Sequence, residues 1–389
     1  MIIGLVGKPA SGKSSFFKAA TLIDVKITGI PFTTIKPNIG IGYVVIDCCE
    51  GEFGVKCSPK HGMCKNGKRY VPVKLVDVAG LVPGAHEGRG LGNQFLDDLR
   101  QASALIHTVD ASGLTDEEGK AVAHHDPAAD VAFLEKEIDL WFASVIQRAI
   151  HKIGKPGGVS PGQSEMIQIL AEQLSGLEVS KKHIDEALRV SSIADVEKFA
   201  TALRKISKPI LIAANKIDLL EAQRNFDQLK QKFAGTLVVP TSAESEIALK
   251  KAAEKNLLDY LPGHDFTITD KSKLSSAQLG ILEKIQHDVI GKYGSTGVQT
   301  CLNKAVFELL NCIAVYPVSD HNKLTDKDGQ VLPDVFLVPR GTTVKELAFK
   351  IHTSLGEKFI AGMDARTKRK LSADYELKNG DVVEIMHAK

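Results

Sequence analysis

Eight residues near the start of the chain have the types and the spacing of a phosphate-binding loop. Residues 7–14 match G-x-x-x-x-G-K-[ST] and directly follow the apolar run 2–6. In this pattern glycines turn backbone N–H groups toward phosphate oxygens, the lysine reaches the β- and γ-phosphates, and the last hydroxyl binds Mg²⁺. A helix that begins near Lys13 adds its positive end to the anion site. The predicted nucleotide contacts are Gly7, Lys8, Pro9, Ala10, Ser11, Gly12, Lys13, Ser14 and Ser15.

Two segments farther along the chain indicate which base is bound. Residues 215–218 read N-K-I-D and follow the apolar run 210–214. The carboxylate of Asp218 can accept from both N1–H and the exocyclic amine of guanine, a donor pair that adenine lacks. Ser242 and Ala243 follow a second apolar run and can offer a backbone N–H to the guanine O6. The residues predicted at the guanine end are therefore Asn215, Lys216, Asp218, Ser242 and Ala243.

Further residues fit Mg²⁺ and the γ-phosphate. Asp77 opens a D-x-x-G motif that closes at Gly80, so its carboxylate can hold Mg²⁺ through water while the Gly80 N–H meets the γ-phosphate. A switch-loop threonine is expected between the first helix and the second strand, and Thr34 is favoured there over Thr33. The predicted metal ligands are Ser14, Thr34 and Asp77. All these motifs occur in the order of a GTPase.

The position that orients the attacking water in Ras-like GTPases is occupied here by Leu81, which has no polar group. We therefore expect a GTPase with slow intrinsic hydrolysis. His86 lies in the glycine-rich loop that follows and is a candidate for placing the water, although a loop histidine is more often a solvated side chain. The predicted catalytic residues are Lys13, Thr34, Gly80 and His86.

Short apolar strands alternate with helical patterns up to about residue 115, and the alternation resumes at residue 209. This rhythm predicts an α/β fold with a parallel P-loop sheet. The intervening helical patterns at 127–151, 164–175 and 181–206 predict a helical insertion. A further helical pattern covers 275–293. We place the GTP-binding domain at 1–118 and 207–300, and the helical insertion at 119–206.

The last part of the chain changes character. Strand patterns at 313–318, 335–338 and 381–386, a turn at 326–329 and a capped helix at 342–355 predict a small β-rich domain over 304–389. Its basic cluster 366–370 could meet phosphates, but nearby acidic residues make a solvated, charge-balanced face almost as good an interpretation.

The segments 4–9, 31–38, 77–85 and 90–92 resemble the Obg-related, YchF-like translation-factor GTPases. This resemblance implies a GTPase domain, a helical insertion and a C-terminal TGS domain of β-grasp (ubiquitin-like) fold, with the ribosome or RNA bound through the TGS and helical domains. Members of the YchF branch often carry a changed guanine motif and prefer ATP, whereas the motif here is intact, as in archaeal-type relatives. Ala10 replaces an asparagine that is linked to K⁺ in related GTPases, which puts potassium activation in doubt.

A cysteine-rich segment between the switch region and the strand near residue 73 offers a second metal site. Cys57, His61 and Cys64, with Cys48 or Cys49, could supply four Zn²⁺ ligands, although the spacing is irregular and reduced cysteines without a metal are the more ordinary interpretation.

The composition limits the function classes. The 389 residues are 43% hydrophobic and 25% charged, with a formal net charge of +2, as expected of a globular protein of two or three domains without a dominant basic surface. No apolar run is long enough for a membrane span, so we expect a cytoplasmic protein with no membrane partner. We further expect a monomer whose ligands are GTP/GDP and Mg²⁺. An ATP-using P-loop enzyme, or an RNA-binding protein with a structural nucleotide site, remain the alternatives to a GTP-operated switch.

Overall fold

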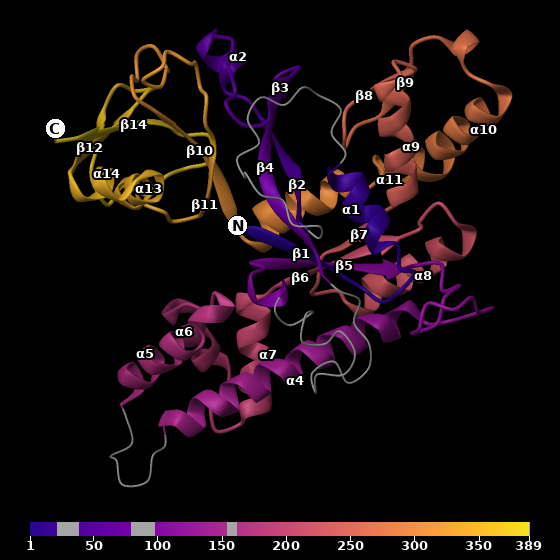
Figure 1. Ribbon diagram of the computed structural model, residues 1–389, viewed down its shortest axis with the longest axis horizontal. Coiled ribbons are helices and arrows are strands. Elements are labelled where there is room, and N and C mark those ends of the chain that lie inside the picture. The colour runs from indigo at the N-terminus through magenta and orange to yellow at the C-terminus, as the bar shows by residue number, and fades with distance from the viewer. Residues whose placement is uncertain (22–38, 79–97, 154–161, 389) are drawn as a thin grey trace. The chain divides into compact units, whose positions relative to one another are not determined.

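The computed structural model describes residues 1–21, 39–78, 98–153 and 162–388 (Figure 1). The expectations for Thr33, Thr34, Gly80, Leu81 and His86 concern residues outside these ranges. The chain divides into two compact units, and the division falls inside strands β2 (Ile39–Asp47) and β4 (Lys68–Asp77). The first unit contains 1–23, 36–42 and 73–305, and the second contains 24–35, 43–72 and 306–389. The three-domain division predicted from the sequence stays a prediction.

A largely parallel sheet with the strand order β2-β4-β1-β5-β6-β7 organises the first unit. Strand β1 lies between β4 and β5, with Leu5 opposite Asp77 and Val6 opposite His107. Every residue of β5 is buried, as expected for an inner strand covered on both faces. Since parallel strands end at a common edge, the carboxyl ends of β1, β4, β6 and β7 meet there. The bounds are β1 (Ile2–Val6), β2 (Ile39–Asp47), β4 (Lys68–Asp77), β5 (Ala104–Asp110), β6 (Ile210–Asn215) and β7 (Val238–Pro240).

The prediction of a parallel sheet holds for β1 with β4 and β5, for β5 with β6, and for β6 with β7. It misses β3 (Met63–Lys65), which pairs antiparallel with β4. The hairpin turn between these strands contains Asn66 at φ 53° and Gly67 at φ 71°, residue types that tolerate the left-handed backbone of a tight turn.

Helices cover the sheet and carry the site loops. Helix α1 contacts α9, and the ammonium group of Lys250 on α9 donates to the carbonyl of Ala19 on α1 at 2.7 Å. The predicted helix over 275–293 contains a π-helical stretch, Gln286–Ile290, between α10 and α11. A short hairpin of β8 (Leu258–Tyr260) and β9 (Phe266–Ile268) was not predicted. The helices are α1 (Lys13–Thr21), α8 (Leu220–Lys232), α9 (Ala243–Glu254), α10 (Ser276–Ile285), α11 (Gly291–Tyr293) and α12 (Val298–Lys304).

The predicted helical insertion is present and shares an apolar core with the sheet. Trp141 and Phe142 pack edge to face, with ring centroids 5.2 Å apart, in the same cluster as Leu105 of β5. The predicted helix 181–206 is two helices, because Asp195 accepts a hydrogen bond from the Lys198 N–H and so caps a new helix. The bounds are α4 (Pro127–Ile153), α5 (Gln163–Gln173), a 3₁₀ turn (Ser175–Leu177), α6 (Lys181–Val190) and α7 (Val196–Ser207).

The second unit contains a sheet with the order β11-β10-β14-β12-β13 and helices packed on it. The predicted helix 342–355 is broken at His352, which has an extended backbone and caps α14 by accepting from the Ser354 N–H. Strand β12 was not predicted. The bounds are α2 (Glu50–Phe53), a π-helical stretch (Ala305–Leu309) at the boundary, β10 (Cys312–Val318), β11 (Phe336–Pro339), α13 (Val344–Ile351), α14 (Thr353–Glu357), β12 (Phe359–Asp364), β13 (Lys370–Leu371) and β14 (Val382–His387).

Among the described residues, we find no helix of the length and apolarity needed to cross a lipid bilayer.

Candidate functional site

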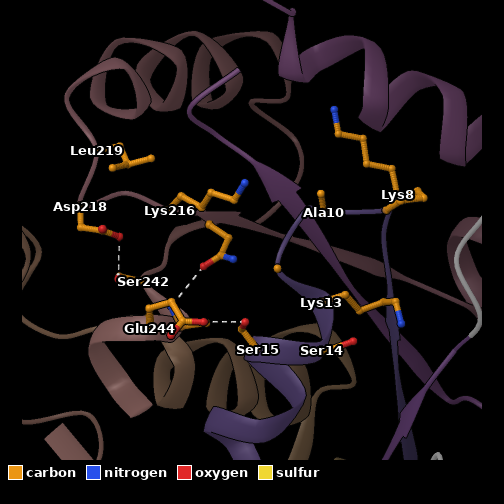
Figure 2. Close-up of a pocket in the computed structure, with 14 residues that line it drawn as sticks. Lys8, Ala10, Lys13, Ser14, Ser15, Lys216, Asp218, Leu219, Ser242 and Glu244 are labelled. Atoms are coloured by element: carbon orange, nitrogen blue, oxygen red, sulfur yellow. Dashed lines mark hydrogen bonds between the residues drawn. The ribbon is translucent and has the colours of Figure 1, made fainter. Parts of the chain in front are cut away.

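A cavity of about 720 Å³ opens at the edge of the sheet where β1, β6 and β7 end (Figure 2). Gly7 and Ser11 are the predicted loop contacts that do not line it. Leu219 and Glu244 line it without having been predicted. The lining residues are Lys8, Pro9, Ala10, Gly12, Lys13, Ser14, Ser15, Asn215, Lys216, Asp218, Leu219, Ser242, Ala243 and Glu244.

The loop after β1 has the backbone of an anion-binding turn. Gly12 has φ 88°, and a Cβ built there would lie 2.1 Å from Nδ2 of Asn215, so only glycine fits. Ala10 has φ 59°, a left-handed conformation that costs an alanine about 1 kcal/mol and that asparagine tolerates better. Helix α1 starts at Lys13 and directs its N-terminal N–H groups at the cavity.

Lys13, Ser14 and Asp77 lie together at the phosphate end. The ammonium group of Lys13 donates to Oδ1 of Asp77, and the Ser14 hydroxyl lies 3.4 Å from Oδ2 of the same carboxylate. The ion pair is only partly exposed. Hydroxyl and carboxylate oxygens are the ligands that Mg²⁺ prefers, so Ser14 and Asp77 fit a Mg²⁺ site next to the lysine.

Asn215 joins the phosphate loop to the segment predicted to recognise the base. Its side chain donates to the carbonyl of Ser11 at 3.0 Å and accepts from the Ala243 N–H at 3.1 Å. The residue is 3% exposed. Because one buried amide satisfies both loops, the two ends of the cavity are held in a fixed relation.

Asp218 and Ser242 lie at the other end of the cavity. The Ser242 hydroxyl donates to Oδ1 of Asp218 at 2.7 Å, which orients the carboxylate (Figure 2). Ser242 also caps α9, since its hydroxyl accepts from the Ser245 N–H. This hydroxyl contact was not predicted, because residues 242–243 were expected to contribute only a backbone N–H.

Lys216 has a carboxylate partner that was not predicted from the sequence. Its ammonium group donates to Oδ2 of Asp110 at 2.8 Å, and Asp110 is fully buried at the end of β5. Burial alone would raise the pKa of Asp110, but hydrogen bonds from Lys216, Ser112 and Thr115 outweigh it and hold this pKa below its usual value. Asp110 therefore stays ionised and fixes Lys216 beside the cavity. The sequence places Asp110 at the end of a predicted strand, but nothing in the sequence identifies Lys216 as its partner.

The side chain of Lys8 is turned away from Lys13 and the phosphate loop (Figure 2). Its ammonium group pairs with Asp130 at 2.8 Å and donates to the carbonyl of Thr115 at 2.6 Å. Asp130 in turn contacts Nε2 of His125 at 2.7 Å. The part of Lys8 near its backbone thus lines the cavity, while its ammonium group anchors the loop to helix α4.

A second carboxylate that was not predicted supports the end of the cavity where Asp218 and Ser242 lie. Glu246 on α9 is fully buried, and it accepts from the Tyr260 hydroxyl at 2.6 Å and from the Thr296 hydroxyl. The carbonyl of Thr296 accepts from the Ser242 N–H at 2.8 Å. The buried carboxylate therefore connects the segment near residue 296 to the loop that carries Ser242. Glu244 adds a contact of 2.7 Å with the Ser15 hydroxyl.

The predicted cysteine cluster forms in the second unit, but with a different fourth member. Cys48, Cys57 and Cys64 gather around Glu50, and their ligand atoms lie within 4.8 Å of one another. His61, which was predicted as a ligand, is not in this group. Glu50 takes the place because α2 starts directly after Cys49 and its carboxylate accepts from the Cys57 N–H at 3.0 Å.

The basic cluster 366–370 is partly engaged within its own unit. Arg366 forms a bidentate pair with Glu52 at 2.5 and 2.7 Å, and Lys368 donates to the carbonyl of His321 at 2.7 Å. Arg369 and Lys370 are exposed. The RNA-binding role expected of this cluster stays a prediction, and it now concerns mainly the last two residues.

Three family models match the chain. A model described as a 50S ribosome-binding GTPase matches residues 2–136, and one described as the G4 motif-containing domain of an Obg-like, YGR210-like GTPase matches 213–320. A TGS domain model matches 323–387, which confirms the prediction of a C-terminal TGS domain.

Similar proteins cover the chain from end to end. An uncharacterized GTP-binding protein of Methanocaldococcus jannaschii is 48% identical over 100% of this chain and 99% of its own length. The crystal structure of a GTP binding protein from Pyrococcus horikoshii OT3 is 38% identical with a TM-score of 0.79, and 100% of each chain is covered. The ribosome-binding ATPase YchF of Escherichia coli O157:H7 is 27% identical over 98% of both chains.

Proposed function

The chain belongs to the YchF-like family of Obg-related GTPases, and from this premise we propose that it is a slow, GTP-operated switch that acts on the ribosome. The observation that carries the proposal is the cavity itself. A phosphate loop and an N-K-I-D segment line one cavity, and the buried amide of Asn215 joins them.

Guanine specificity follows from Asp218. Its carboxylate is oriented by Ser242 at the end of the cavity away from Lys13, where a base would lie when phosphates occupy the loop. A carboxylate matches the two donors of guanine, whereas the amine and unprotonated N1 of adenine do not. The name of the Escherichia coli relative, a ribosome-binding ATPase, makes ATP the competing candidate. The intact N-K-I-D sequence favours GTP.

Nucleotide binding would exchange partners at the phosphate end. Lys13 and Asp77 neutralise each other in this structure, and each is suited to a different part of the ligand. Lys13 would turn to the β- and γ-phosphates, while Asp77 and Ser14 would hold Mg²⁺. When bound, Mg²⁺ would neutralise charge on the phosphate oxygens. Lys13 and the N–H groups at the start of α1 would stabilise the charge that develops on the transferring phosphoryl group.

Slow hydrolysis rests on Leu81, because an aliphatic side chain cannot orient the attacking water. We propose Thr34 and Gly80 as sensors of the γ-phosphate and His86 as a candidate for placing the water. A slow hydrolase would remain in the GTP state long enough to report it to a partner. The name of the Escherichia coli relative and the description of the matching GTPase model both point to the ribosome as that partner.

The proposal is tested by ribosome sedimentation of the purified full chain with GDP or a non-hydrolysable GTP analogue, alongside equilibrium binding of GTP and ATP. We expect tighter binding of GTP than of ATP, and ribosome association that differs between the two guanine nucleotides. Equal affinity for ATP would favour an ATP-using enzyme. Undetectable turnover with nucleotide-independent RNA binding would favour an RNA-binding protein whose nucleotide is structural.

A further inference from the structure

The side chains around Glu50 form a cluster that nucleotide binding does not use. Cys48 follows β2, Cys57 lies in the loop after α2, and Cys64 lies in β3. The fold thus brings three separate parts of the chain together at the cluster. The sulfur atoms of Cys48 and Cys57 are 3.7 Å apart, and the Cys64 thiol lies 3.2 Å from Oε1 of Glu50. Cys57 is 8% exposed, and Cys48 and Cys64 are half-buried.

The cysteine-rich segment 48–64 has little regular structure of its own. Its elements are the four-residue helix α2 and the start of the short strand β3. Segments this short do not hold their conformation without tertiary contacts or a cross-link. A bound ion shared by residues 48, 50, 57 and 64 would supply such a cross-link across the whole segment.

The segment supports the C-terminal part of the same unit. Cys49 and Cys57 belong to an apolar cluster with Tyr316 of β10 and Val382 of β14. Backbone pairs extend the contact, since the Ser58 N–H donates to the carbonyl of Val331 at 2.8 Å.

Charged side chains add to this support. Lys60 of the segment pairs with Asp326 at 2.5 Å. Just beyond the segment, the buried Arg69 of β4 donates to the carbonyls of Leu332 and Pro333 at 3.1 and 2.6 Å. The position of the segment therefore bears directly on the packing of the TGS domain.

The donor set selects the ligand class. Three thiols and one carboxylate within 4.8 Å would repel one another if they ionised without a cation between them. A disulfide between Cys48 and Cys57 would use only two of these four groups. It would not explain why Cys64 and Glu50 lie beside them, whereas one metal ion would bind all four. Thiolates favour a soft or borderline ion over Mg²⁺ or Ca²⁺, and four ligands suit the tetrahedral preference of Zn²⁺.

We propose that Cys48, Glu50, Cys57 and Cys64 bind a structural Zn²⁺ that fixes segment 48–64 as a support for the TGS domain. The ion is distinct from the Mg²⁺ that accompanies the nucleotide, and binding of GTP does not require it. Four protein ligands leave no open position, so the site stabilises the fold and has no catalytic role.

The test is the metal content of the purified full chain, measured by elemental analysis after dialysis in a reducing buffer. We expect about one Zn²⁺ per chain, as a closed four-ligand site requires. The variants Cys64→Ser and Glu50→Ala should lose most of it. Cys49→Ser and His61→Ala are matched controls from the same segment and should retain it.

Because substitution of a ligand can unfold the segment, the wild-type chain provides a second measurement. Replacement of Zn²⁺ by Co²⁺ should give the thiolate-to-metal charge-transfer absorption of a tetrahedral site, and removal by a chelator should raise hydrogen exchange in segment 48–64 while GTP affinity stays unchanged. The proposal is overturned if the reduced chain, incubated with excess Zn²⁺, retains none. It is equally overturned if Cys64→Ser retains as much Zn²⁺ as the wild type, or if a Cys48–Cys57 disulfide forms in its place.

Discussion

Changing Asp218 to Asn should transfer the preference of the cavity from guanine to xanthine nucleotides. The substitution keeps the shape of the side chain but replaces one carboxylate oxygen by an NH₂ group. Because the Ser242 hydroxyl donates to Oδ1 of Asp218 at 2.7 Å, it favours the rotamer of the new amide whose oxygen faces Ser242. The NH₂ group would then point toward the ligand. It would oppose the donors of guanine and match the carbonyl O2 of xanthine.

The expected size of the effect follows from the bonds involved. A hydrogen bond to a charged group contributes about 1.5–3 kcal/mol, and guanine offers two donors to this carboxylate. The substitution removes one such bond and places the new NH₂ group against an N–H donor of guanine. Together these changes should cost about 3 kcal/mol, which is a loss of roughly 150-fold in GDP affinity. Affinity for xanthosine diphosphate should rise, and affinity for ADP should stay low.

The assay is competition among unlabelled GDP, xanthosine diphosphate and ADP against a fluorescent guanine nucleotide bound to the wild type, and against its xanthine analogue bound to the variant. Asp374→Asn is the matched control, because Asp374 is an exposed aspartate in the C-terminal domain. A variant that binds GDP as tightly as the wild type does, with no gain for xanthosine diphosphate, would refute the assignment of Asp218 to the base. So would a wild-type chain that binds ADP as tightly as GDP.

Three further predictions concern the site and its support. Gly12→Ala should abolish GTP binding in a titration, because residue 12 has φ 88° and the new Cβ would lie 2.1 Å from the Asn215 amide. Normal GTP affinity would contradict this loop geometry. Lys8→Met should lower the free energy of unfolding by about 3–5 kcal/mol in urea melts, since it removes the ammonium partner of the buried Asp130 and leaves that carboxylate with only its His125 contact. Lys8→Met combined with Asp130→Leu should recover much of the loss, and equal losses would show that the ion pair is not responsible. Burial and the nearby charge of Lys8 lower the pKa of His107 from 6.5 to about 3. The unfolded chain therefore binds the proton first, and stability should fall by about 2 kcal/mol from pH 8 to pH 5 through this group, a loss that His107→Phe should remove from urea melts at the two pH values.

Much of the nucleotide site was predictable because its motifs describe local backbone. The glycine at position 12 and the lysine and serine after it specify a turn into a helix, wherever the rest of the chain lies. In the same way, the N-K-I-D segment follows an apolar run, which predicts that Asp218 lies at the edge of the sheet. The parallel order of strands and the apolar faces of the insertion helices were also encoded by hydrophobic periodicity.

The family, the phosphate loop and the guanine-recognising segment could thus be identified from local motifs, since each depends on residues close together in the chain. Which distant groups become partners depends instead on the folded arrangement of the whole chain. It gave Lys216 the carboxylate of Asp110, turned Lys8 toward Asp130, paired Arg366 with Glu52, and put Glu50 rather than His61 among the three cysteines. Such pairs depend on how the whole chain folds back on itself, and residue spacing carries no record of that path.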